Sequence, residues 1–306
     1  MVPNLIFDVG MHNGDDTAYY LARGYNVVAV EADPTLIEDA RKRFPDEVRD
    51  GRLILLNCAI GDADGKATFW VCPHNRAWNS FTREVTARHG YPVEPIDVPV
   101  RRFKGILAQY GVPYYLKIDI EGYDRACLED IDPADRPRYV SWEVSSLEDM
   151  VLVRSKGYNA FKCISQATFL TLEVGRARGS RKTTRKHAFT SRLRALVRKM
   201  PAVHRVARAV SERRRGKDPE GKAAVYTVST IHWDGKSWSF PLGSAGPFGP
   251  DLPGEWKAME VAAYEYYDYW LHTASRADMA GRDWFDMHAT TLDESQAPKI
   301  GSSLQG

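Results

Sequence analysis

Acidic side chains end several short apolar runs in the first half of the chain. Asp8 and Glu31 end the first two runs, and Asp119 and Glu143 end two later ones. A carboxylate in such a place can accept hydrogen bonds from a ligand or take a proton from a reacting group. Because four acids share the same position relative to their runs, the pattern predicts one binding site rather than four unrelated side chains.

A glycine turn follows the first of these acids. Gly10 and Gly14 bound the turn, and Asp15 and Asp16 open the helix-like segment after it. The order is that of a nucleotide-binding βαβ unit: an apolar run, a glycine turn, a helical segment and a second apolar run that ends in an acid. In such units the acid binds ribose hydroxyls. Glycine lets the backbone approach a ligand closely, and carboxylates at the turn suit a cationic ligand better than a pyrophosphate.

The spacing of the two glycines narrows the choice of ligand. The turn reads G-x-x-x-G with an acid two residues before it, whereas the dinucleotide fingerprint has three glycines. This spacing resembles the loop of S-adenosylmethionine (SAM) methyltransferases. A dinucleotide site and a turn with a purely structural role are the alternatives.

The elements that position these residues alternate between strands and helices. Apolar runs rich in β-branched or aromatic residues predict six strands: Leu5–Val9, Asn26–Val30, Arg52–Ile60, Tyr114–Ile120, Tyr139–Val144 and Asn159–Ser165. Helical patterns between them imply an α/β fold with a doubly wound, mostly parallel sheet. Ligands of such sheets bind beyond the carboxyl ends of the strands, where the sequence places five polar groups: Asp8–Gly14, Glu31–Asp33, Asn57–Asp62, Asp119–Gly122 and Glu143–Ser146.

The remaining segments are predicted to elaborate this sheet. They are an extra strand at Ala67–Cys72, an irregular segment at His74–His89 that folds over the pocket as a lid, a hairpin at Ala224–Ser239 with Asp234-Gly235 as its turn, a Gly- and Pro-rich loop at Gly243–Asp251, and an aromatic helix from Trp256 to about Leu271. Residues 291–306 are expected to form a disordered polar tail.

The whole-chain composition is that of a soluble globular protein. Its 306 residues are 43% apolar and 27% charged, and no apolar run approaches the ~20 residues that span a bilayer. The first strand begins near residue 5, which leaves no room for a signal peptide. The four cysteines form no C-x-x-C pair, so we expect reduced thiols, no zinc site and a cytoplasmic location.

Positive charge is concentrated in one segment. Residues 176–222 hold 17 Lys and Arg against 3 Asp and Glu, while the rest of the chain holds 25 against 37. Apolar residues at helical spacing, among them Phe189, Leu193 and Val197, predict a basic amphipathic insertion. It is expected to contact an anionic membrane at its inner face, to grip an anionic polymer, or to remain a solvated insertion. Nucleic acid is disfavoured as a partner, because the segment has a single aromatic residue and base stacking needs several.

Several phrases together resemble those of one family. They are D-V-G-M-x-N-G-D-D-T, V-x-A-V-E-A-D-P, L-K-I-D-I-E-G-x-D, Y-V-S-W-E-V, F-K-C-I-S-Q, G-S-A-G-P-F-G and W-F-D-M-H, and they resemble the FkbM family of SAM-dependent methyltransferases. The resemblance covers about residues 4–175 and 223–290. It implies a Rossmann-like class I domain that methylates a hydroxyl, usually on a sugar, glycan or polyketide-type product.

The chain then divides into a SAM-binding methyltransferase core (1–175), the basic, partly helical insertion (176–222), the C-terminal part of the methyltransferase domain (223–290) and the tail (291–306).

The resemblance assigns cofactor binding to eight residues: Asp8, Gly10, His12, Asn13, Gly14, Glu31, Ala59 and Asp62. Residues of the glycine turn would surround the methionine part of SAM, Glu31 would hold the ribose, and residues 57–62 would border the adenine. His12 departs from the pattern, because many methyltransferases place a small residue or glycine there.

Removal of a proton from an acceptor hydroxyl needs a base, for which there are three main candidates: Asp119, Glu143 and His288. Asp119 ends the fourth predicted strand, which in methyltransferases ends beside the transferable methyl. His89 and His232 are further candidates. Ion pairing, helix capping or core packing is the structural alternative for each. No third ligand with a clear spacing accompanies the acids, so no metal site is predicted.

The sequence therefore predicts a SAM-dependent O-methyltransferase that acts on a sugar, glycan or related natural product, including a lipid-linked glycan. Alternatives are methylation of a lipid, a small metabolite or a carboxylate, and a non-catalytic SAM-binding module docked by its basic insertion. No sequence feature indicates an oligomeric state.

Overall fold

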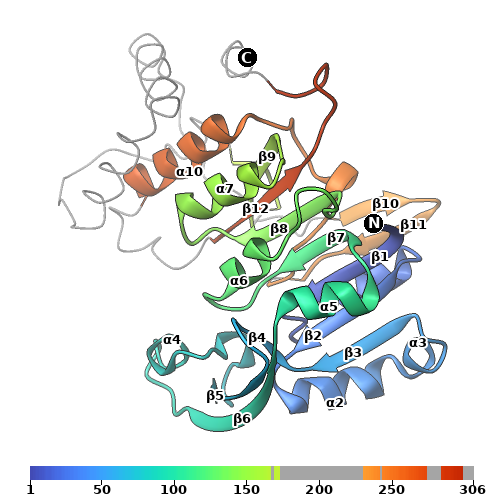
Figure 1. The fold of residues 1–306 in the computed structure, drawn as a ribbon, viewed down its shortest axis with the longest axis vertical. Coiled ribbons are helices and arrows are strands. Elements are labelled where there is room, and N and C mark those ends of the chain that lie inside the picture. The colour runs from blue at the N-terminus through green and yellow to red at the C-terminus, as the bar shows by residue number, and fades with distance from the viewer. Residues whose placement is uncertain (167–168, 173–229, 242, 274–283, 299–306) are drawn as a thin grey trace.

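The computed structural model of the chain describes residues 1–166, 169–172, 230–241, 243–273 and 284–298. Its centre is a seven-stranded sheet in the order β3-β2-β1-β7-β8-β12-β9 (Figure 1). The strands are β1 (Val2–Val9), β2 (Asn26–Glu31), β3 (Leu53–Asn57), β7 (Pro113–Ile118), β8 (Tyr139–Glu143), β9 (Ala160–Ser165) and β12 (Phe285–Thr290). All are parallel except β12, which pairs antiparallel with both β8 and β9. The predicted α/β class with a mostly parallel sheet is confirmed.

The sheet is buried on both faces, as its apolar strands require. Phe7 and its neighbours on one face pack against α5 (Phe103–Tyr110), α6 (Asp124–Glu129), α7 (Leu147–Ser155) and α10 (Met259–Thr273). Ile6 and its neighbours on the other face pack against α1 (Asp15–Ala22) and α2 (Pro34–Arg43), which α3 (Pro45–Arg49) follows. The helix predicted from Trp256 begins at Met259.

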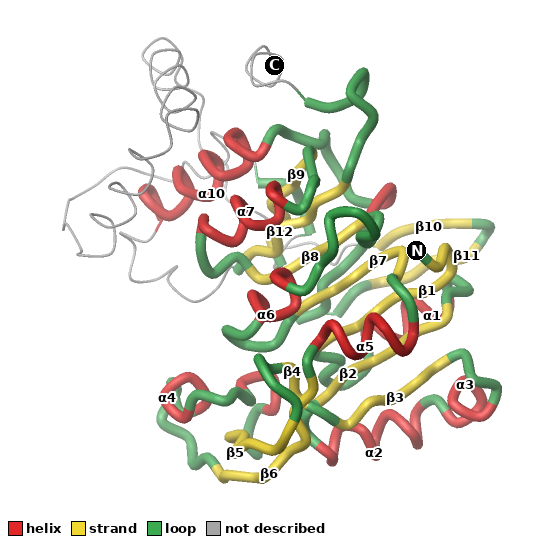
Figure 2. The backbone as a smooth tube through the Cα atoms, in the orientation of Figure 1, coloured by secondary structure: helices red, strands yellow, loops and turns green. Residues whose placement is uncertain are grey.

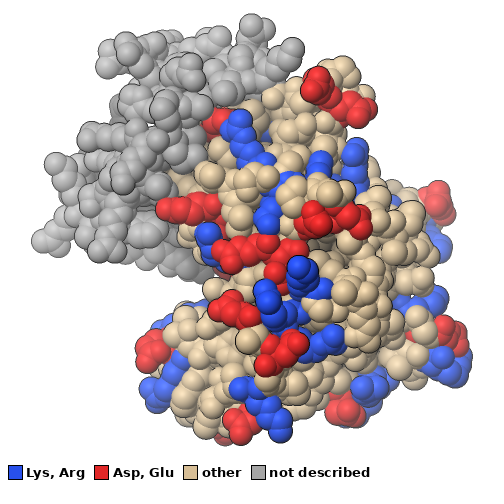
Figure 3. Space-filling view, viewed as in Figure 1, with Lys and Arg blue, Asp and Glu red and all other residues tan. Residues whose placement is uncertain are grey.

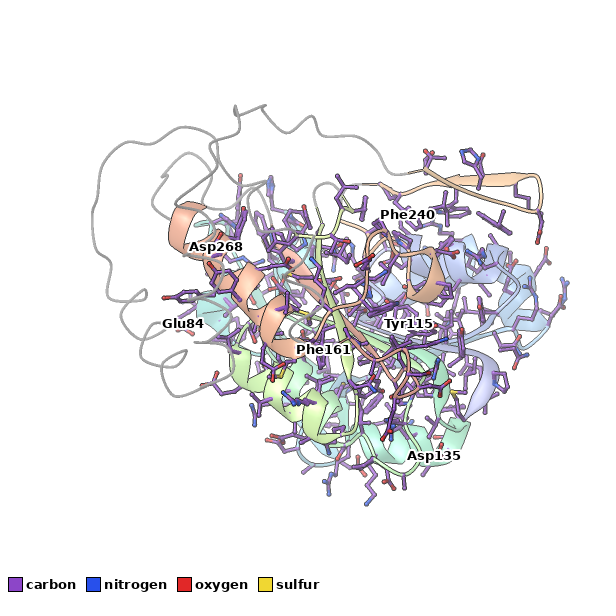
Figure 4. All side chains as sticks on the ribbon, turned by 90° about the horizontal axis from the view of Figure 1, so that it is seen from above. Glu84, Tyr115, Asp135, Phe161, Phe240 and Asp268 are labelled. Atoms are coloured by element: carbon purple, nitrogen blue, oxygen red, sulfur yellow. The ribbon has the colours of Figure 1, made fainter. Side chains whose placement is uncertain are left out.

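A hairpin covers α1 on its outer side. Strands β10 (Thr230–Trp233) and β11 (Lys236–Ser239) meet at Asp234 and Gly235, whose φ angles of 45° and 74° are those of a tight hairpin turn. The Tyr19 ring of α1 lies 6.1 Å from Trp233 and 5.8 Å from Trp238. Phe240 lies at the base of the hairpin (Figure 4). The predicted hairpin is confirmed over residues 230–239, and residues 224–229 lie outside the described part.

A second, smaller sheet lies beside the carboxyl edge of β3. It has the order β4-β6-β5 and consists of β4 (Ala59–Ile60), β5 (Gly65–Val71) and β6 (Glu94–Arg101). Figure 2 shows these strands gathered with α4 (Arg83–Thr86), apart from the main sheet. The connection between β5 and β6 also holds η1 (Arg76–Trp78).

One strand prediction needs correction, and one strand of the smaller sheet was not predicted. The single strand expected at Arg52–Ile60 is divided at Asn57, whose side-chain amide donates to the carbonyl oxygens of Glu31 and Ala32, each at 3.0 Å. Strand β6 was not predicted, because Pro95 and Pro99 are rare inside strands. Both prolines lie where β6 pairs with β5 alone, since β4 reaches only the last two residues of β6.

The C-terminal part of the chain returns to the main sheet. β12 lies between β8 and β9, and η2 (Gly249–Asp251) lies in the loop that precedes α10. The basic insertion 176–222 lies outside the described residues, as do residues 299–306 of the expected tail. Within the described residues, no helix has the length and apolar character needed to cross a membrane.

Candidate active site

The glycine turn after β1 is shaped by the protein's own packing. Gly10 and Gly14 have φ angles of 82° and 80°, in the left-handed region that favours glycine. A Cβ atom on Gly10 would lie 1.8 Å from the carbonyl oxygen of Asp119, and one on Gly14 would lie 2.9 Å from the Phe44 ring. The sequence suggested that the glycines make room for a ligand. In the structure they make room for β7 and for the segment after α2.

A buried ion pair fixes the turn to the centre of the sheet. Asp8 is fully buried, and its Oδ2 accepts a hydrogen bond of 2.6 Å from the Thr17 hydroxyl. Lys117 Nζ lies 3.2 Å from Asp8 Oδ1 and donates to the Gly10 carbonyl oxygen at 2.7 Å. Burial alone would lower the pKa of Lys117, but the neighbouring Asp8 and Asp119 carboxylates outweigh it and raise that pKa. The lysine therefore stays charged and ties the turn to β7.

Glu31 spans the turn and the end of β2. Its carboxylate accepts hydrogen bonds from the backbone N–H groups of His12 at 3.0 Å and Asp33 at 2.9 Å. Burial raises the pKa of Glu31 to about 7, although the two N–H donors oppose this shift. The remaining lone pairs of the carboxyl group can accept hydrogen bonds from a ligand.

The structure brings most of the predicted cofactor residues together. Asn13 shapes the turn that leads into α1, because its Oδ1 accepts a hydrogen bond of 3.0 Å from the Asp15 N–H. The turn residues and Glu31 thus form one connected group at the ends of β1 and β2. Ala59 lies buried on β4, and Asp62 is exposed in the loop after it, both on the smaller sheet.

Asp119 and Glu143 lie at the ends of adjacent strands, β7 and β8. The Asp119 side chain is 47% exposed, and its Oδ2 lies 3.7 Å from Lys117 Nζ. Burial, reinforced by the neighbouring carboxylates, raises the pKa of Glu143 to about 8. Glu143 therefore carries a proton at neutral pH.

Asp286 is a third acid at this edge that the sequence analysis did not single out. It lies opposite Glu143 in the antiparallel β8–β12 register, so the two side chains share one face of the sheet. Burial and the nearby carboxylates raise its pKa well above the usual range. No described residue donates a hydrogen bond to the carboxyl group of Asp286 or Glu143. The sequence indication of Asp286 was the phrase W-F-D-M-H, where the alternation of a strand places Asp286 on the same face as His288.

Asp124 is a fourth acid at this edge; it is buried, and its role is structural. Its two oxygens accept hydrogen bonds from the backbone N–H groups of Ile120 at 2.9 Å and Glu143 at 3.2 Å. Burial raises the pKa of Asp124 to about 7. The side chain therefore holds the ends of β7 and β8 at a fixed separation.

His288 lies deeper in the sheet than the acids. It is 1% exposed and lies opposite Ser141 on β8 and Lys162 on β9. Burial, with a smaller contribution from Lys162, lowers the pKa of His288 to about 3, so the imidazole is neutral. The structure separates His288 from solvent and places Asp286 between it and the open edge of the sheet.

The Gly- and Pro-rich loop braces α1. Asp16 accepts hydrogen bonds from the Ser244 hydroxyl and from the Ala245 N–H, and Phe248 stacks on Tyr115 with ring centroids 4.3 Å apart. Burial raises the pKa of Asp16 to about 6. The loop that the sequence predicted at Gly243–Asp251 is thus buried against the helix that follows the glycine turn.

The predicted lid, residues 74–89, is attached to both halves of the site. At its start, Asn79 Nδ2 donates to Asp33 at 3.1 Å, and Asp33 in turn caps α2. Near its end, Arg88 makes two hydrogen bonds of 2.8 and 3.1 Å to the carboxylate of Glu121. The segment therefore joins the end of β2 to the turn after β7.

The other candidate histidines lie elsewhere. His89 packs on Trp78 within the lid, and His232 lies on the β10 hairpin strand. Among the described residues, no group of three or more His, Cys, Asp or Glu side chains is arranged to hold a metal ion.

Strand order, glycine turn and acid-ended β2 together define a Rossmann-like class I methyltransferase. A family model described as "Methyltransferase FkbM domain" matches residues 8–166. The chain belongs to the FkbM methyltransferase family, and its cofactor is SAM.

A similar solved structure is that of a TehB-like SAM-dependent methyltransferase from Corynebacterium glutamicum. It is 11% identical in sequence, with a TM-score of 0.30 over 54% of this chain and 70% of that one. No curated protein matches the sequence.

Proposed function

We propose that this methyltransferase transfers the methyl group of SAM to a hydroxyl group of a sugar or glycan. The observation that carries the proposal is the contact between Gly10 and the Asp119 backbone. It joins the glycine turn, on the cofactor side, to the carboxyl groups of the acceptor side. A cofactor held at the turn would therefore present its methyl group next to Asp119.

The residues of the turn fit SAM. Carboxylates surround it, and they suit the ammonium and sulfonium groups of the cofactor. Glu31 would accept hydrogen bonds from the ribose hydroxyls, and residues 57–62 would border the adenine. SAM supplies an activated methyl group whose bond to sulfur breaks as a bond to the acceptor oxygen forms.

The acceptor side would position the hydroxyl and take up its proton. Asp119 is the exposed carboxylate at the junction, and we assign it the role of base, which is worth roughly 10²–10⁴-fold in rate. Glu143, and Asp286 when it carries a proton, would donate hydrogen bonds to other oxygens of the acceptor; burial raises the pKa of both. His288, which lies deeper in the sheet on the same face of β12, would help to position Asp286.

A polyhydroxyl acceptor suits this set of groups. The Glu143 carboxyl group, whose pKa is raised, lies beside the exposed Asp119, so the site can both donate hydrogen bonds to hydroxyl groups and accept them. A carboxylate acceptor fits poorly, because Asp119 would repel its charge. A lipid-linked glycan would present the same hydroxyl groups as a free one.

The test is transfer of labelled methyl groups from SAM to a panel of sugars and cell-surface glycans. We expect Asp119→Asn to lower kcat by roughly 10²–10⁴-fold while the Kd for SAM stays unchanged. Asp135→Asn is the matched control, because that carboxylate precedes β8, at the opposite edge of the sheet from the strand-end acids, and pairs with the N-terminus at 3.1 Å. SAM binding without turnover on any acceptor would instead identify a non-catalytic SAM-binding module.

A further inference from the structure

Exposed aromatic rings gather at the carboxyl edge of the sheet. In the described part of the chain, the exposed Phe, Tyr and Trp side chains are Tyr91, Tyr123 and Trp284, at 40%, 36% and 36%. Tyr91 lies two residues after the lid, Tyr123 in the turn after β7, and Trp284 directly before β12. All three therefore lie on the side of the sheet that carries the acids, which is not the scatter expected of incidental surface residues.

Stacked rings hold Tyr91 in place. Its ring lies 3.7 Å from that of His74 and nearly parallel to it, at 12°. Trp78 lies 5.9 Å from Tyr91, and the His89 ring lies 4.1 Å from Trp78. Tyr91 is thus both exposed and fixed, which limits the entropy that a ligand must remove when it binds.

An ion pair joins these rings to the acceptor carboxyls. Arg88 binds the Glu121 carboxylate through two hydrogen bonds, and its guanidinium lies 5.8 Å from the centre of the Trp78 ring. Ser80 Oγ donates to the Glu121 carbonyl oxygen at 3.2 Å, and Phe81 contacts Tyr123 at 4.7 Å. Glu121 is two residues from Asp119, so the rings adjoin the proposed base.

We propose that Tyr91 and Tyr123, here called the aromatic rim, bind a sugar ring adjacent to the sugar that receives the methyl group. The inference rests on the proposed function and deepens it. A pyranose ring presents C–H groups on its faces, which pack on aromatic rings, and hydroxyls at its edge, which donate to carboxylates. The preferred acceptor is therefore a chain of at least two linked sugars rather than a single one.

The charges near the rim favour a neutral glycan over a lipid surface. The Asp119 and Glu121 side chains are 47% and 21% exposed, and both carry carboxyl groups beside the rings. Arg88 offsets the charge of Glu121, so it is mainly Asp119 that would repel anionic lipid head groups or an anionic polymer from these carboxyl groups. The hydroxyls of a neutral sugar would instead hydrogen-bond to them.

The test compares acceptors that differ only in length. The probes are methyl glycosides of glucose, mannose, galactose and rhamnose, with the matching di- and trisaccharides, assayed with labelled SAM. We expect Tyr91→Ala and Tyr123→Ala each to raise KM for the longer acceptors about two- to tenfold. KM for single sugars and the Kd for SAM should not change. Tyr91→Phe should restore the wild-type KM, and Val151→Ala on α7, where the side chain is 44% exposed, is the control.

The outcomes separate the two proposals. If the wild-type enzyme methylates single sugars and longer acceptors equally well, and both alanine variants match it, the aromatic rim is refuted while the proposed function stands. If the wild-type enzyme methylates no member of the panel, the proposed function fails and the rim fails with it.

Discussion

Glu143 keeps its proton at neutral pH because burial and neighbouring acids raise the pKa of its carboxyl group to about 8. Its protonated form is thus a hydrogen-bond donor facing the acceptor side, next to the exposed Asp119. The two acids differ in their surroundings, although both end strands of the same sheet: Asp119 is 47% exposed, and burial dominates at Glu143. The sequence identified both residues, but only burial distinguishes their roles.

The protonation of Glu143 leads to a prediction about pH. We expect kcat/KM to fall as the pH rises through about 8, because the carboxyl group then loses its proton and can no longer donate. Glu143→Gln keeps a donor at the same place and does not titrate, so its kcat/KM should stay level across this range. A pH–rate profile for both proteins checks this. A decline of equal size in Glu143→Gln would assign the ionisation to another group.

Sequence patterns located the acids that end apolar runs, but not an acid that joins the site only through the pairing of strands distant in sequence. Asp8, Glu31, Asp119 and Glu143 were identifiable because each ends a recognisable run. Asp286 was not, because it lies near the start of an antiparallel strand. Its relation to Glu143 exists only through the β8–β12 register.

Among the elements, the glycine turn shows most directly how packing constrains the site. The sequence predicted the turn, while its contacts with Asp119 and Phe44 depend on how β7 and α2 pack. Gly10→Ala should therefore lower the free energy of unfolding by more than about 3 kcal/mol, from a backbone clash added to positive φ.

Gly24→Ala is the matched control for this prediction. Gly24 has a similar φ of 87°, but a Cβ atom there would meet no heavy atom within 4 Å, so its loss should be only about 1–2 kcal/mol. Urea denaturation of both variants measures the difference. Equal losses would show that φ alone, rather than contact with β7, requires glycine at position 10.

The predicted strands of the parallel sheet are present because buried parallel strands have strong apolar signals. Strand β12 was missed because Asp286 and His288 interrupt its apolar pattern, and β6 because of its prolines. In both cases, neighbouring strands supply the partners that make an atypical sequence stable. Local patterns do not contain that information.

For the whole molecule, the contrast in charge between the insertion and the remaining chain is the main unexplained feature. The face seen in Figure 3 mixes acidic and basic side chains, whereas residues 176–222 carry 17 Lys and Arg against 3 Asp and Glu. We propose that this segment brings the enzyme to an anionic membrane surface where lipid-linked glycans are found.

Deleting residues 176–222 should abolish sedimentation with vesicles that contain phosphatidylserine. The expected contribution is about 1 kcal/mol for each Lys or Arg near the surface, so the loss should be large at low salt. Vesicles of phosphatidylcholine alone are the control, and methylation of a water-soluble glycan should survive the deletion. Unchanged sedimentation would rule out membrane contact through this segment.

The late position of β12 in the sequence determines which part of the site is complete first while the protein is synthesised. By residue 166 the chain has supplied β1, β2 and β3, and with them the glycine turn and Glu31. It lacks β12, which separates β8 from β9, and it lacks Asp286. A ribosome must add more than a hundred further residues before Glu143 gains its partner. The half proposed to hold the cofactor is thus encoded first, and the proposed acceptor half is completed only when β12 enters the sheet.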